Sequence, residues 1–118
     1  MGIPNNDMVY LLKGIINQVR YAEEKHPDFA ARFESSTTML PAVQNALTVA
    51  RAKSDAEAKD GYSFEATINE EILEALEAYL QGDLEHARQE LRQCGAVIVR
   101  ALWWLNNLKE IPNDSNKI

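Results

Sequence analysis

The sequence contains a single cysteine, Cys94, and no apolar run approaching the ~20 residues needed to cross a bilayer. One cysteine cannot form an internal disulfide, and Cys94 lies in an apolar helical pattern, so we expect a reduced, cytoplasmic setting. The N-terminus has no basic region followed by an apolar one, so no secretory signal is expected. The sequence therefore predicts neither a membrane protein nor a disulfide-stabilised secreted one.

Basic residues are also scarce, because 18 acids stand against 12 bases and give a formal charge of −6. A nucleic-acid surface needs a basic stripe, so we expect no nucleic-acid partner. A nucleotide substrate stays open, because a divalent cation can neutralise phosphates locally. The 118 residues are enough for one domain with a core and too few for two. We expect one domain over residues 1–118, with an ordered core at about 7–110 and a flexible polar tail at 112–118.

Strand signals are absent, since no alternating run is bounded by hairpin turns, and there is no internal repeat. Four segments instead carry apolar residues at helical spacing. This pattern predicts an all-α protein, a compact four-helix bundle. The predicted helices cover residues 7–25, 39–59, 63–82 and 84–109, and the loop at 29–38 is expected to contain one helical turn at 29–33.

Capping residues set these boundaries. Gly82 suits the position just after the third helix, and Pro41 is tolerated only in the first turn of the second. Pro27 biases the residue before it away from helical angles and so ends the first helix. Good N-cap residues stand at three predicted starts: Asn6 or Asp7, Ser63 and Asp83.

The fourth helix is more apolar than a small domain can easily cover. Between Cys94 and Leu105 it is nearly apolar all round, as in helices buried on more than one side. We expect its surface around Val99 and Trp103 to lie in an interface between copies, in a homodimer or homotetramer. A heptad pattern runs along its whole length: Leu84, Ala87, Leu91, Cys94, Ile98, Ala101, Leu105 and Leu108.

Acidic residues recur at a spacing that predicts a metal site. Glu71 and Glu74 are i, i+3 neighbours on one helix face, and Glu90 and Gln93 repeat this spacing on the next helix. If these helices pack as an antiparallel pair, three carboxylates and one carboxamide converge. Such oxygen ligands suit a hard cation such as Mg²⁺. Pairing with Arg or Lys, or simple exposure as a solvated acidic face, is the alternative.

These motifs resemble the MazG-like all-α nucleoside triphosphate pyrophosphohydrolases, which include helical dUTPases. The resemblance covers roughly residues 20–106 and is closest to short single-domain members of phages and actinobacteria. Its elements follow the family order: His26-Pro27-Asp28, the Ala/Lys/Asp-rich stretch at 50–55, Phe64, Glu70-Glu71-x-x-Glu74, and Glu90-Leu91-Arg92-Gln93 followed by an apolar run.

The resemblance implies that Mg²⁺, with Mn²⁺ as a substitute, binds Glu71, Glu74, Glu90 and position 93. Water then attacks the α-phosphorus and releases a nucleoside monophosphate and pyrophosphate. Glu70 is implied as an auxiliary acid that orients water or a second ion, so the implied catalytic residues are Glu70, Glu71 and Glu74.

Two basic residues are candidates for binding phosphate. Lys53 matches a basic position of the family's second helix, and otherwise is a solvated surface lysine. Arg100 follows Glu90 by ten residues, and otherwise pairs with Glu71 or Glu74. The remaining candidates have structural interpretations: His26 as a loop-capping group, His86 as a solvated first-turn residue, Trp103 and Trp104 as core or interface aromatics, and Cys94 as a core residue.

One position departs from the family, because Gln93 stands where the best-understood enzymes carry Asp. A Gln carbonyl oxygen can still bind Mg²⁺ but brings no charge. The leading hypothesis is a Mg²⁺-dependent pyrophosphohydrolase acting on a canonical or modified (d)NTP. The alternatives are a non-catalytic nucleotide- or partner-binding module on the same fold, and a helical interaction domain.

Overall fold

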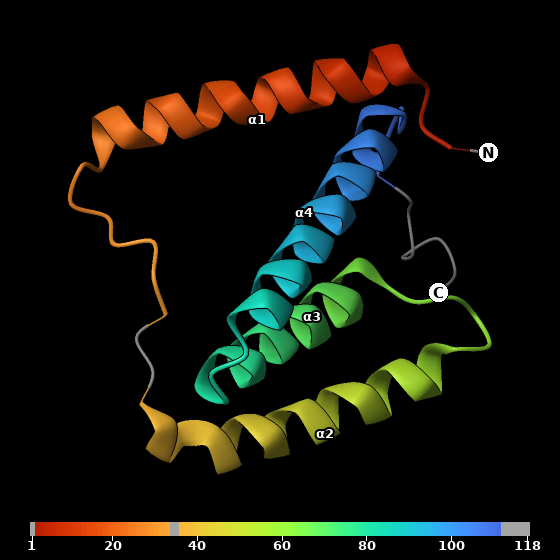
Figure 1. Cartoon of the computed structure of the whole chain (residues 1–118). Coiled ribbons are helices and arrows are strands. Elements are labelled where there is room, and N and C mark those ends of the chain that lie inside the picture. The colour runs from red at the N-terminus through yellow and green to blue at the C-terminus, as the bar shows by residue number, and fades with distance from the viewer. Residues whose placement is uncertain (1, 34–35, 112–118) are drawn as a thin grey trace.

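The computed structural model describes residues 2–33 and 36–111, and in this part of the chain every regular element is helical. The predicted all-α class and the four helices are therefore confirmed (Figure 1). The tail predicted to be flexible at 112–118 lies outside the described residues. The elements are α1 (Asn5–Lys25), the short 3-10 helix η1 (Thr37–Met39), α2 (Leu40–Glu57), α3 (Phe64–Leu80) and α4 (Leu84–Asn106).

Local capping chemistry fixes the α3–α4 hairpin as the sequence predicts. The Ser63 side chain accepts a hydrogen bond from the backbone N–H of Ala66 (3.1 Å), and Asp83 caps α4 in the same way. Gly82 has a φ of +82°, which places it in the left-handed region that favours glycine. The N–H of Asp83 donates to the carbonyl of Ala78 (2.9 Å), so α3 ends in a Schellman motif.

The start of α1 differs from the prediction. The helix begins at Asn5 after Pro4, which offers no capping side chain. Asn6 and Asp7 therefore lie in the first turn and do not act as N-caps. The Asp7 carboxylate has another partner, because its Oδ2 accepts a hydrogen bond from Nε1 of Trp103 (3.3 Å). A distant contact thus replaces the local cap that sequence alone suggested.

Three smaller differences concern the connections and the last helix. Residues 29–33 form no helical turn, and the short helix η1 was not predicted. α4 ends at Asn106, three residues before the expected end. The start of α2 agrees, since Pro41 lies in its first turn.

Packing is concentrated in α2, α3 and α4. α3 and α4 form an antiparallel hairpin, and α2 packs against α3 (Figure 1). The buried faces of the hairpin are lined largely by small side chains, which let the helix axes approach closely. These residues are Ala75 and Ala78 of α3 and Ala87 and Cys94 of α4, while Leu47 of α2 is the largest fully buried side chain.

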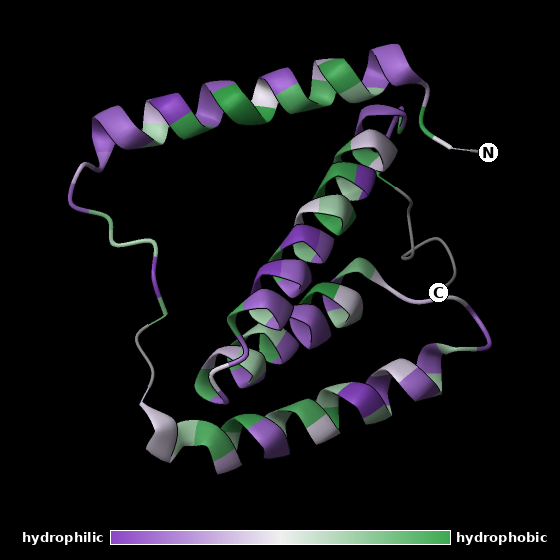
Figure 2. Ribbon diagram, in the orientation of Figure 1, coloured by the Kyte–Doolittle hydropathy of each residue, from purple (hydrophilic) through white to green (hydrophobic). Residues whose placement is uncertain are grey.

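α1 stands apart from this core. Its main contact is with α4, and Leu11 is its one buried residue among those described. Apolar side chains such as Val9, Ile16 and Val19 stay about half exposed, and Figure 2 shows apolar stretches along this helix. The radius of gyration is 17.0 Å. A compact chain of this length has about 13.5 Å, so the monomer is an open arrangement.

The apolar surface of α4 is distributed differently from the predicted heptad. Ala87 and Cys94 are buried, but the positions at Leu84, Leu91, Ile98 and Leu105 are 41–54% exposed. The reason is that α3 covers only one side of this row of heptad positions, and the buried Glu90 of α4 faces α3. Heptad spacing shows that a helix has an apolar face but does not show how much of that face a neighbouring helix covers.

The surface around Val99 and Trp103 is partly covered within the chain. Val99 is buried within the chain, and Trp103 contacts α1 through its hydrogen bond to Asp7. Val99 is therefore not available to a second copy, and an interface that includes Trp103 stays a prediction. The exposed apolar side chains of α4 lie instead along the heptad positions from Leu84 to Leu105.

Candidate functional site

Three of the predicted glutamates come together between α3 and α4. Glu71 and Glu74 project from α3, and Glu90 faces them from α4 and is only 5% exposed. The Oε2 atoms of Glu71 and Glu90 are both buried without a hydrogen-bond partner. A buried carboxylate oxygen without a partner is costly, so this cluster calls for a proton or a cation.

The raised pKa values of Glu71 and Glu74 reflect the same free-energy cost of keeping carboxylates out of water. Burial, followed by the charges of Glu90 and Glu70, raises the pKa of Glu71. The pKa of Glu74 is raised from 4.5 to about 7 by burial first, then by a hydrogen bond with Glu70 and by the charges of Glu90 and Glu70. The charge of Arg51 acts in the opposite direction on Glu74. Burial and repulsion between neighbouring negative charges both favour the protonated form of a carboxyl group.

His86 belongs to this cluster, which the sequence interpretation missed. Its Nε2 lies 3.1 Å from Oε1 of Glu90, one helical turn along α4, and its backbone N–H donates to Asp83. The His86 side chain is 51% exposed and that of Glu90 is 7% exposed, so the imidazole lies on the solvent side of the buried carboxylate. The signal was the i, i+4 spacing of His86 and Glu90, which sets both side chains on one face.

Cys94 and Gln93 have opposite surroundings. Cys94 is buried as predicted, and burial raises the pKa of its thiol, followed by the charges of Glu71 and Glu90. Gln93 is exposed to solvent. The buried side of α4 thus runs through Glu90 and Cys94, one turn apart, and Gln93 lies outside it.

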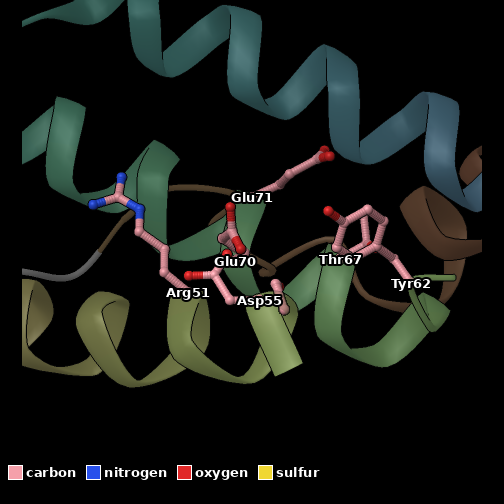
Figure 3. Close-up of a pocket in the computed structure, with 7 residues that line it drawn as sticks. Arg51, Asp55, Tyr62, Thr67, Glu70 and Glu71 are labelled. Atoms are coloured by element: carbon pink, nitrogen blue, oxygen red, sulfur yellow. The ribbon is translucent and has the colours of Figure 1, made fainter. Parts of the chain in front are cut away.

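An open groove of about 410 Å³ lies between α2 and α3, beside the acidic cluster. Figure 3 shows Glu71 reaching from the groove toward α4, which links the groove to the cluster. Its lining includes Arg51 and Asp55 of α2, Tyr62 of the connecting loop, and Thr67, Glu70 and Glu71 of α3.

The two predicted phosphate-binding residues lie elsewhere. Lys53 is exposed and acts on the carboxylate of Glu57, and it does not line the groove. Arg100 is ten residues from Glu90, which is about 15 Å along the helix axis. Within residues 2–33 and 36–111 it forms no ion pair with Glu71 or Glu74, so that predicted pairing is wrong.

Arg51 is the basic side chain that lines the groove. It is exposed and forms no ion pair among the described residues. The buried residues Leu47, Ala50 and Ser54 show which side of α2 faces α3. Arg51 follows Ala50 directly and therefore lies at the edge of that face, a signal that sequence periodicity alone could have given.

The donor chemistry of the cluster fits a hard divalent cation. Glu71, Glu74 and Glu90 supply carboxylate oxygens, and two of these oxygens are buried and unpaired. Among the described residues no three His, Cys, Asp or Glu side chains already stand at coordinating positions. Binding would therefore draw the long glutamate side chains together by rotamer changes.

Comparisons with known protein families, with characterised proteins and with solved structures give no significant match to this chain. The fold and the site alone define its class, an all-α protein with a buried acidic cluster beside an open groove. In the part of the chain that the structure describes, no helix combines the length and apolarity needed to cross a membrane.

Proposed function

We propose that this chain is a Mg²⁺-dependent, MazG-like nucleotide pyrophosphohydrolase that cleaves a (d)NTP to the (d)NMP and pyrophosphate, with Mn²⁺ as a substitute ion. The observation that carries the proposal is the pair of buried, unpaired oxygens on Glu71 and Glu90. Most buried polar atoms in folded proteins have a partner, and a bound cation would supply one to both of these oxygens. The sequence motifs supply the reaction, and the adjoining groove supplies room for a substrate.

The proposed roles follow from where each side chain lies. Glu71, Glu74 and Glu90 would hold the cation, which when bound supplies charge neutralisation at the phosphates and a more acidic water. Water attacks the α-phosphorus, and the bond from that phosphorus to the bridging oxygen of pyrophosphate breaks. Glu70 lines the groove beside Glu71 and takes the proton of the attacking water.

His86 has a positioning role in this scheme. Its contact with Oε1 of Glu90 at 3.1 Å fixes the carboxylate so that Oε2 faces the other glutamates. Charged and hydrogen-bonding partners behind a metal-binding side chain commonly set its orientation. Gln93, being exposed, has no assigned role in holding the cation.

We also propose that the chain works as a cytoplasmic homo-oligomer. The support for assembly is the open shape of the monomer and the half-exposed apolar side chains on α1 and α4. Contiguous exposed apolar surface on a small protein usually marks an interface.

The test is to follow pyrophosphate release from each NTP and dNTP with Mg²⁺, using the wild-type chain and Glu71→Gln. We expect turnover that the substitution reduces at least about a hundredfold, since one charged ligand is lost. Glu24→Gln, an exposed carboxylate on α1, is the matched control and should leave turnover unchanged. Metal-dependent nucleotide binding without turnover would contradict the enzyme hypothesis and support a non-catalytic nucleotide-binding module. If the chain shows no nucleotide binding and no turnover, the remaining hypothesis is a helical interaction domain.

A further inference from the structure

The groove between α2 and α3 has chemically different ends. Figure 3 shows Arg51 at one end and Tyr62 at the other, with Asp55 and Glu70 between them. A guanidinium suits phosphate oxygens, and an aromatic ring suits the face of a base. An elongated ligand with a phosphate end and a base end would therefore meet different side chains in its two possible orientations in the groove.

The aromatic end is held in place by the loop that carries it. Tyr62 follows Gly61, whose φ is +87°, and precedes the N-cap residue Ser63. The Glu57 carboxylate accepts hydrogen bonds from the backbone N–H of Ser63 (3.0 Å) and from its hydroxyl (3.1 Å). This clamp joins the end of α2 to the start of α3, so the loop between them is short and fixed. The Tyr62 ring is 62% exposed and thus available to a ligand.

The cationic end lies next to the acidic cluster. Arg51 is close enough to Glu74 for its charge to act on that carboxylate. From Thr67 to Glu74 the helix α3 rises by about 10 Å, which is comparable with the separation of the base from the β-phosphate in an extended nucleotide. The carboxylate of Asp55 lies between the ends, where it can hydrogen-bond to ribose hydroxyls, and Thr67 lines the groove beside Tyr62.

We infer that the groove binds a nucleoside triphosphate in one direction, with the phosphates at Arg51 and the base stacked on the ring of Tyr62. This inference rests on the proposed function and adds the substrate's orientation and the residue that holds its base. Because stacking depends on the ring face, the same contact accepts more than one base.

The experiment compares a ligand that has a base with one that lacks it. Calorimetric titration of the full chain in Mg²⁺ uses α,β-methylene nucleoside triphosphates, which resist cleavage at the α-phosphorus, and inorganic tripolyphosphate. The variants are Tyr62→Ala, Tyr62→Phe and Arg51→Gln. Tyr10→Ala and Arg20→Gln, at exposed positions on α1, are the matched controls. Circular dichroism verifies that every variant keeps its helix content.

We expect Tyr62→Ala to weaken nucleotide binding by about tenfold or more, as for the loss of one base–aromatic stack, without changing tripolyphosphate binding. Tyr62→Phe should bind like the wild type, and Arg51→Gln should weaken both ligands. Nucleotide binding that is insensitive to Tyr62→Ala, or tripolyphosphate binding that is insensitive to Arg51→Gln, overturns the orientation while leaving the proposed function intact. A wild-type chain that binds neither ligand overturns both.

Discussion

Replacing Glu90 by Gln separates the charge of the buried carboxylate from its shape. The side chain keeps its volume, and its Oε1 can still accept a hydrogen bond from His86. The substitution removes the negative charge from a residue that is 5% exposed and that has one unpaired buried oxygen. We therefore expect Glu90→Gln to raise the free energy of unfolding of the metal-free protein and to abolish its response to Mg²⁺.

The expected size follows from Glu74. A pKa raised from 4.5 to about 7 corresponds to at most about 3 kcal/mol of unfavourable interaction with the ionised form, and solvent screening at this partly exposed carboxyl lowers that figure. The charge of Glu90 is one of several causes of that rise, and Glu90 also carries an unpaired buried oxygen, so removing its charge should relieve about 1–2 kcal/mol in all. The total of about 1–2 kcal/mol should raise Tm by about 3–8 °C for a chain of this size.

The assay is thermal unfolding followed by circular dichroism at pH 7.5, in EDTA and in saturating Mg²⁺. Mg²⁺ at a hundred times its Kd should stabilise the wild-type chain by about 2.7 kcal/mol and leave the variant unchanged. Glu24→Gln, an exposed carboxylate, should stay within about 0.5 kcal/mol of wild type in both conditions. The reasoning is refuted if Glu90→Gln lowers Tm in EDTA or retains the full Mg²⁺ response.

Two further predictions concern pH and assembly. The raised pKa of Glu74 makes the folded state bind more protons than the unfolded state between pH 4.5 and about 7, so the metal-free protein should lose stability as pH rises through this range. Tm measured in EDTA from pH 5 to 7.5 should fall and saturating Mg²⁺ should reduce the slope, whereas a rising Tm in EDTA would contradict this sign. Ile16→Lys on the exposed side of α1 should shift the mass measured by light scattering toward the monomer, and Lys13→Glu should not; equal masses for wild type and Ile16→Lys would exclude α1 from the interface.

Local chemistry accounts for what the sequence predicted well. Ser63, Asp83 and Gly82 mark the boundaries of α3 and α4 because capping depends on a few neighbouring atoms. Once a short turn joins two helices, they pack antiparallel, and the i, i+3 spacing of Glu71 and Glu74 then sets both opposite Glu90. The acidic cluster was therefore predictable without any knowledge of the rest of the fold.

Helix rotation and long-range contacts account for what the sequence could not give. The local pattern predicts an interface at Val99 because it does not show that Val99 is buried within the chain or that α1 returns to contact α4. The place of Arg51 at the groove, where Lys53 is absent, depends on which side of α2 packs against α3. The place of Tyr62 depends on the hydrogen bonds between Glu57 and Ser63, which span a loop rather than a helical repeat.

The separate position of α1 has a consequence for how the molecule can vary. Every residue of the acidic cluster and of the groove comes from the continuous segment 40–106, and none comes from α1. Changes along the first helix can thus alter its exposed apolar surface while the clustered glutamates keep their places. The exposed apolar side chains of α1 can therefore be substituted without touching the carboxylates or the groove, whereas those of α4 share a helix with Glu90.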